Sequence, residues 1–138
     1  MAKEGNSNQG SSQNRQPEGL DKKFVRQGAD KITEEDVKKV LDQADEIRKK
    51  FSRKGPIGRF INDVELLISI VRDYTSGEYR KIPWLSIAAI VFALLYVLNP
   101  LDIIPDVIPI IGYLDDAAVI AVCLTLVEQD LDDYRTWK

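Results

Sequence analysis

Four aspartates near the C-terminal third of the chain are the residues with the clearest capacity for chemistry. Asp102, Asp106, Asp115 and Asp116 lie in the stretch NPLDIIPDVIPIIGYLDD, residues 99–116, together with three prolines. Carboxylates, with carbonyls that the prolines leave unpaired, are the oxygen ligands that Ca²⁺, Mg²⁺ and Mn²⁺ prefer. Their spacing matches no EF-hand loop, however, and short carboxylates at helix starts can instead accept free amide hydrogens. Capping is the favoured interpretation, and a cation site is the alternative.

Other catalytic chemistry has few residues available to it. The chain of 138 residues contains no histidine and one cysteine, Cys123, which excludes internal disulfides, Cys/His zinc sites and every mechanism that needs an imidazole base. Cys123 lies in the apolar run AAVIAVCLTLV, where a thiol is expected to pack as a small hydrophobe. Nothing beside the aspartates supplies a nucleophile, a phosphate-binding loop or a cofactor fingerprint. We therefore predict no catalytic residue, no enzyme activity and no cofactor, with Ca²⁺, Mn²⁺ or Mg²⁺ as the alternative.

The aspartates follow a long apolar segment that must position them. PWLSIAAIVFALLYVL runs for sixteen residues without a charge, and Ile82 extends it to seventeen. As a helix it would rise about 25 Å, slightly less than a hydrocarbon layer of about 30 Å. Basic residues precede the run and aromatic residues lie near its ends, where amphipathic rings suit the headgroup layer. The predicted membrane-interface residues are Tyr79, Arg80, Lys81, Trp84 and Tyr96.

A second apolar run follows the aspartates and completes a hairpin. Residues 117–127 would rise only about 16 Å, too little to span a bilayer alone. Pro105 and Pro109 interrupt any regular helix between the two runs. The sequence therefore predicts an apolar helical hairpin over residues 82–127 that reverses at residues 99–116 in a membrane. The alternative is a central helix buried in a soluble helical bundle.

The N-terminal part of the chain divides into a polar tail and amphipathic helices. Residues 1–31 are rich in Gly, Ser, Asn and Gln, and we expect a disordered tail. Residues 32–55 are expected to form an amphipathic helix that Thr33 and Asp36 cap, and a second such helix is expected to end near Gly77. Residues 56–138 are assigned to one helical domain. The apolar stripes could pack together in water or lie on a membrane surface, and periodicity leaves both open.

The charge distribution limits the classes of partner. Residues 1–98 carry 17 basic and 14 acidic groups, whereas residues 99–138 carry 2 basic and 8 acidic groups. No strongly basic face is implied, so nucleic acid is not an expected partner. We expect membrane lipid, with a protein partner or a second copy of the chain in addition.

The block GEYRKIPW, followed by an apolar helix ending in LYVLNPLDIIPDVIPIIGYLDDAAVIAV, resembles the YkvA-like family, the domain of unknown function DUF1232. The resemblance covers about residues 60–134. It implies an all-helical, membrane-associated protein and leaves the activity open, because the family has no established reaction. The signature residues of the resemblance are Pro100, Asp102, Pro105, Asp106, Pro109, Gly112, Asp115 and Asp116.

Together these observations predict an all-α protein with a disordered tail, amphipathic helices and a membrane-embedded apolar hairpin, its N-terminus cytosolic because Arg80 and Lys81 flank the first apolar run. The predicted function is that of a non-enzymatic anchoring or interaction module at a membrane. The alternatives are a cation-binding or small ion-conducting or regulatory membrane protein that uses the aspartates, and a soluble helical bundle.

Overall fold

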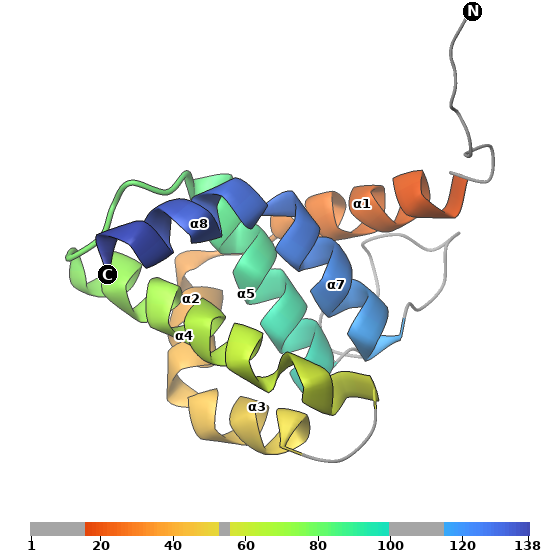
Figure 1. Ribbon diagram of the computed structural model, residues 1–138, viewed down its shortest axis with the longest axis horizontal. Helices are drawn as coiled ribbons and strands as arrows, with labels where there is room; N and C mark the ends of the chain where they lie inside the picture. Colours follow the sequence, from red (N-terminus) through yellow and green to blue (C-terminus); the bar gives the residue numbers. More distant parts are fainter. Residues whose placement is uncertain (1–15, 53–55, 100–114) are drawn as a thin grey trace, which may run out of the picture.

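The computed structural model describes residues 16–52, 56–99 and 115–138, and within these ranges every regular element is a helix (Figure 1). The all-α prediction is therefore confirmed. The elements are α1 (Gln16–Ala29), α2 (Glu34–Asp42), α3 (Ala44–Phe51), the 3₁₀ helix η2 (Pro56–Phe60), α4 (Ile61–Ser76), α5 (Trp84–Leu98), α7 (Asp116–Leu126) and α8 (Glu128–Trp137).

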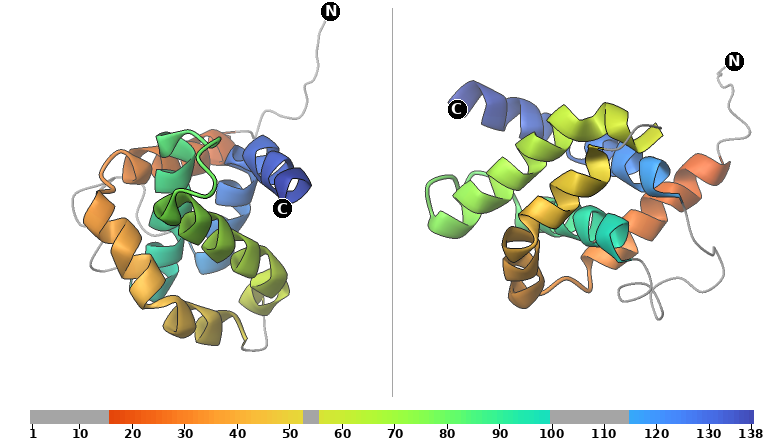
Figure 2. Two further views of the ribbon diagram at one scale, coloured as in Figure 1. Left: turned by 90° about the vertical axis from the view of Figure 1, so that its left-hand side faces the viewer. Right: turned by 90° about the horizontal axis from the view of Figure 1, so that it is seen from below.

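Helix α5 lies at the centre of the protein. Eleven of its fifteen residues are buried, and it contacts α1, α2, α3, α4 and α7 (Figures 1 and 2). Val91 and Leu95, which a lipid-facing helix would expose, are 0% and 5% exposed. The structure thus gives no support to the predicted membrane-embedded hairpin and places α5 in a protein core. A helix that is apolar on every side suits either environment, so its sequence alone does not distinguish them.

The pairing of the two apolar helices is nevertheless as predicted, because α7 packs directly on α5. Residues 100–114, where the chain was expected to reverse, lie outside the described residues. In the part of the chain that the structure describes, no helix combines the length and the apolar character needed to cross a membrane.

Helix α1 corrects the prediction that residues 1–31 form a disordered tail, because its residues 16–29 are helical and packed on α5 and α7. Phe24 and Val25 are fully buried, and the Phe24 ring makes edge contacts with Phe92 at 5.7 Å and Tyr96 at 5.6 Å between centroids. Gly28 lies against the Phe92 ring, which lets the two helices approach closely. A few apolar residues with helical spacing are thus enough to order a mostly polar segment on a large apolar surface.

The single helix predicted over residues 32–55 is replaced by two, α2 and α3, which span residues 34–42 and 44–51. The capping box is confirmed: the Asp36 amide donates to Thr33 Oγ1 at 3.3 Å, and the Thr33 amide donates to Asp36 Oδ2 at 2.9 Å. Non-helical backbone at Gln43, with φ −108° and ψ 22°, then separates α2 from α3. The expected apolar stripe faces α4 and α5 across both helices, so it packs on protein.

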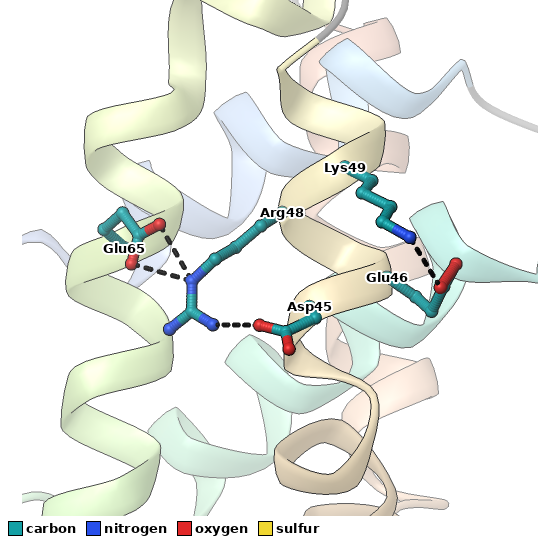
Figure 3. A network of polar contacts seen from close by, with 5 residues as sticks. All are labelled: Asp45, Glu46, Arg48, Lys49 and Glu65. Atoms are coloured by element: carbon teal, nitrogen blue, oxygen red, sulfur yellow. Dashed lines mark hydrogen bonds and ion pairs between the residues drawn. The ribbon is translucent and has the colours of Figure 1, made fainter.

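A charged contact joins α3 to α4 at the surface (Figure 3). Arg48 Nε donates to both carboxylate oxygens of Glu65, at 3.0 and 2.9 Å, and Arg48 Nη1 donates to Asp45 at 2.9 Å. The hydrogen bond to Glu65 is the main reason that the pKa of Arg48 is raised. Because this bridge is partly exposed, its contribution to stability is on the order of 0.2–1 kcal/mol.

Helix α4 ends where the sequence predicts, at Gly77, whose φ of 89° lies in the left-handed region that glycine adopts readily. The connection to α5 then returns toward the core, because the Tyr79 amide donates to the Asp73 carbonyl at 3.1 Å and the Tyr79 side chain is 3% exposed. This connection, residues 77–83, is the α4–α5 loop.

Candidate functional site

Two of the four predicted aspartates belong to described residues, and both lie at the start of α7. Asp115 is the N-cap, and its carboxylate accepts the Ala118 amide at 2.9 Å, so its capping role is confirmed. Asp116 is half-buried in the first turn. Burial raises the pKa of Asp116 against the lowering effect of the Lys50 charge. Both carboxylates therefore lie at the N-terminal end of α7.

Replacing Asp115 with alanine is expected to lower the free energy of unfolding by about 1 kcal/mol, because the Ala118 amide loses its acceptor. Asp115→Asn keeps a capping oxygen and should remain within a few tenths of a kcal/mol of the wild type. Urea denaturation of the two variants measures the difference. Equal stability of the two variants would contradict a capping role.

The remaining signature residues, Pro100, Asp102, Pro105, Asp106, Pro109 and Gly112, lie outside the described residues. Within the described ranges, no group of three or more Cys, Asp or Glu side chains is placed to hold a metal ion. The cation site thus stays a prediction.

The five predicted membrane-interface residues divide into two groups. Tyr79 and Tyr96 are 3% and 1% exposed, which contradicts a role for their rings among lipid headgroups. Arg80 and Lys81 are exposed, and Trp84 is half-buried. The two tyrosines are enclosed because α8 covers one and α1 the other: Tyr79 contacts Tyr134, and Tyr96 contacts Phe24.

A cluster of hydrogen-bonded polar side chains around the buried Asp73 connects α8 to α4. Tyr134 donates its hydroxyl hydrogen to Asp73 Oδ2 at 2.5 Å, and Lys138 Nζ donates to the same oxygen at 3.0 Å. Because a tyrosine hydroxyl has one hydrogen, Ser69, whose Oγ lies 2.5 Å from the Tyr134 oxygen, must donate to it. Asp73 is the buried charged residue of the described core, with 8% of its surface exposed. Its carboxylate accepts hydrogen bonds from two donors, Tyr134 and Lys138.

The protonation behaviour of this cluster follows from its geometry. Burial acts to raise the pKa of Asp73, but hydrogen bonds from Tyr134 and Lys138 and the positive charge of Lys138 outweigh it, so the pKa is lowered. Burial and the hydrogen bond to Asp73 raise the pKa of Tyr134. Asp73 is therefore favoured as a carboxylate and Tyr134 as a phenol, and together with Lys138 they form a hydrogen-bonded ion-pair network.

Cys123 provides no nucleophile either. Its side chain is fully buried, with Sγ 3.7 Å from the Ala89 carbonyl, and burial raises the pKa of the thiol to about 12. The prediction of a packed cysteine is confirmed.

The polar cluster also shapes the surface around the α4–α5 loop. The rings of Tyr79, Tyr134 and Trp137 form one group, with centroids 4.9 Å apart for Tyr79 and Trp137. This contact places Trp137, 45% exposed, beside the loop from the α8 side, while Leu85, 60% exposed, stands just after the loop in α5. We define the loop face as Arg80, Lys81, Trp84, Leu85 and Trp137.

Sequence reasoning identified three residues of the loop face and missed Leu85 and Trp137, as well as the Asp73 cluster behind them. One feature of the sequence could have indicated the Asp73 cluster. Leu66 and Ile70 lie off the predicted stripe of α4, and Asp73 follows Ile70 by three residues on that second row. A second row on α4 predicts a second neighbour for that helix, and Asp73 of this row accepts a hydrogen bond from Tyr134 of α8.

The fold defines a small helical protein built around one apolar helix, and its exposed large apolar side chains among the described residues are Leu85, which follows the α4–α5 loop, and Trp137, which contacts Tyr79 of that loop. A family profile for a protein of unknown function (DUF1232) matches residues 86–122. The chain is also 36% identical over 78 residues to the uncharacterized membrane protein YkvA of Bacillus subtilis (strain 168), an alignment that covers 56% of this chain and 74% of that protein. No solved structure gave a significant match. The chain belongs to the YkvA-like DUF1232 family.

Proposed function

We propose that this protein is a non-enzymatic, membrane-associated interaction module whose loop face lies against the headgroups of an anionic bilayer. The observation that carries the proposal is the position of Leu85 and Trp137. They are the large apolar side chains that the described surface exposes, and both flank the loop that bears Arg80 and Lys81. The description of the Bacillus subtilis relative as a membrane protein supports the same location.

Each component of the loop face contributes to binding in a known way. A Lys or Arg close to an anionic surface is worth about 1 kcal/mol. Covering an exposed leucine or an aromatic ring adds on the order of 1–2 kcal/mol each. Two cations and two apolar side chains therefore suffice for reversible attachment, and α5 keeps its contacts inside the bundle. The competing arrangement, in which the bundle opens and the α5–α7 pair enters the bilayer, would have to give up the burial of α5.

Sedimentation with vesicles tests the proposal. The protein should bind vesicles that contain phosphatidylglycerol and bind poorly to pure phosphatidylcholine vesicles. Binding should weaken as salt increases, because exposed charges are screened. Alkaline carbonate should release the bound protein, whereas an inserted hairpin would resist extraction.

Substitutions locate the contact. Leu85→Ser with Trp137→Ser, and separately Arg80→Glu with Lys81→Glu, should each reduce the binding constant for vesicles at least tenfold, which corresponds to a loss of about 1.4 kcal/mol. A matched control changes two exposed lysines away from the loop face, Lys39→Glu with Lys49→Glu, and should bind as the wild type does. Equal losses in the control and the loop-face variants would show that overall charge, and not this face, governs binding.

A further inference from the structure

A cavity of about 320 Å³ opens between α2, α4 and the start of α5, immediately behind the loop face. Lys38 lines it from α2, and Arg80 lines it from the α4–α5 loop. Tyr74 and Trp84 form an aromatic wall, with ring centroids 6.4 Å apart. Two cations separated by more than forty residues in the sequence thus converge on one hollow with an aromatic side.

The cations of this cavity outnumber its acids, and neither is held in an ion pair among the described residues. Among the described residues, neither Lys38 nor Arg80 forms an ion pair with a carboxylate, in contrast to Arg48 and Lys49 on the next helix. The Arg80 guanidinium instead stacks over the Tyr74 ring at 4.7 Å, which restrains its orientation and leaves its donors for a ligand. Glu34 is the acidic residue of the lining, so the cavity has a formal charge of +1.

We propose that this cavity binds the phosphodiester headgroup of an anionic glycerophospholipid, with Lys38 and Arg80 on the phosphate and Trp84 against the glycerol. A phosphodiester carries one negative charge, which matches the cavity. Charge-assisted bonds from an arginine and a lysine are the strong contacts available to such a group. A bilayer in contact with the loop face would present its headgroups to the cavity, because Arg80 and Trp84 belong to both the loop face and the cavity lining. The inference rests on the proposed function, and it makes the membrane contact selective for a headgroup.

Solution binding of a soluble headgroup tests the cavity apart from the bilayer. The probe is glycerophosphoglycerol, titrated into the full-length protein while ¹H–¹⁵N spectra record the two tryptophan indole signals, which Trp84→Phe assigns. We expect a saturable shift of the Trp84 indole and little change at Trp137, which does not line the cavity. Lys38→Gln should weaken binding about tenfold, as expected for the loss of one charge-assisted bond. Lys39→Gln is the matched control, because Lys39 is the next residue of α2 and lines a different cavity.

Each outcome of this titration tests a different claim: the headgroup site, its selectivity for anionic lipid, or the proposed function. The absence of a saturable Trp84 shift, or equal affinities of the Lys38 and Lys39 variants, would overturn the cavity as a headgroup site. Inorganic phosphate or glycerophosphocholine binding as tightly as glycerophosphoglycerol would overturn its assignment to anionic lipid. A Trp84 shift in a protein that ignores vesicles would refute the proposed function alone, whereas vesicle binding without the shift would refute this inference alone.

Discussion

Replacing Gly28 with valine is expected to lower the free energy of unfolding by about 3 kcal/mol or more. A Cβ atom at this position of α1 would overlap the ring of Phe92. The ring cannot move aside easily, since Phe92 is fully buried and lies 5.7 Å from Phe24 and 6.0 Å from Tyr96 between centroids. Accommodating the valine would therefore push α1 away from α5 and break contacts along both helices. Urea denaturation, followed by circular dichroism, measures the loss.

Gly19 supplies the matched control, because no atom of the described residues lies within 4 Å of a Cβ atom placed there. Gly19→Ala should leave stability unchanged or increase it by up to about 1 kcal/mol, as expected for a helical position free of steric conflict. A double-mutant cycle adds a second check. In a Phe92→Leu background the smaller side chain leaves more room, so Gly28→Val should cost at least about 1 kcal/mol less than in the wild type. An unchanged cost would mean that α1 does not pack on Phe92 as described.

Removing the Tyr134 hydroxyl, in Tyr134→Phe, is expected to destabilise the protein by about 2 kcal/mol. The substitution keeps the ring contacts with Tyr79 and Trp137 but leaves the buried Asp73 carboxylate with Lys138 alone, and Ser69 loses its acceptor. Thr136→Val is the control on the same helix, since Thr136 is exposed and its hydroxyl donates to the Asp132 carbonyl of the preceding turn. Thermal unfolding of both variants should separate them by several degrees.

The hydrogen bonds of Asp73 also predict how the free energy of unfolding changes as the pH is lowered. The pKa of Asp73 is lower in the folded protein than in the unfolded chain, so its contribution is fully present above the unfolded value. That contribution is lost as the pH falls through the folded pKa, where the native carboxylate takes up a proton. Tyr134→Phe removes a donor that lowers this pKa, so the variant should lose less stability on acidification than the wild type does. Parallel acid profiles for the two proteins would contradict the assigned hydrogen bond.

Local features were predictable because they depend on residues close in sequence. The Thr33–Asp36 capping box, the end of α4 at Gly77 and the Asp115 cap each need only a few neighbouring residues, and each is present in the structure. The apolar stripe of residues 33–51 likewise follows from helical periodicity. The break at Gln43 was missed because no proline or glycine marks it, and helix α1 was missed because its segment is mostly polar.

The candidate site was less predictable, because its residues come from distant segments. Arg80, Lys81 and Trp84 were identified from their position beside an apolar run. Nothing in the sequence brings Trp137 to that loop or places Lys38 and Arg80 in one cavity, since both depend on how the helices pack in three dimensions. Burial of Tyr79 and Tyr96 was missed for the same reason.

The amino-acid sequence by itself determined that this protein is helical, that the helix over residues 84–98 avoids water and that its chemistry must proceed without an imidazole base. These properties follow from periodicity and composition, which act within single segments. Only the tertiary structure decided what covers α5. A uniformly apolar helix lowers its free energy equally well in lipid or among other helices, and the choice rests on whether α1, α2, α3, α4 and α7 present matching apolar faces to it, as they do here.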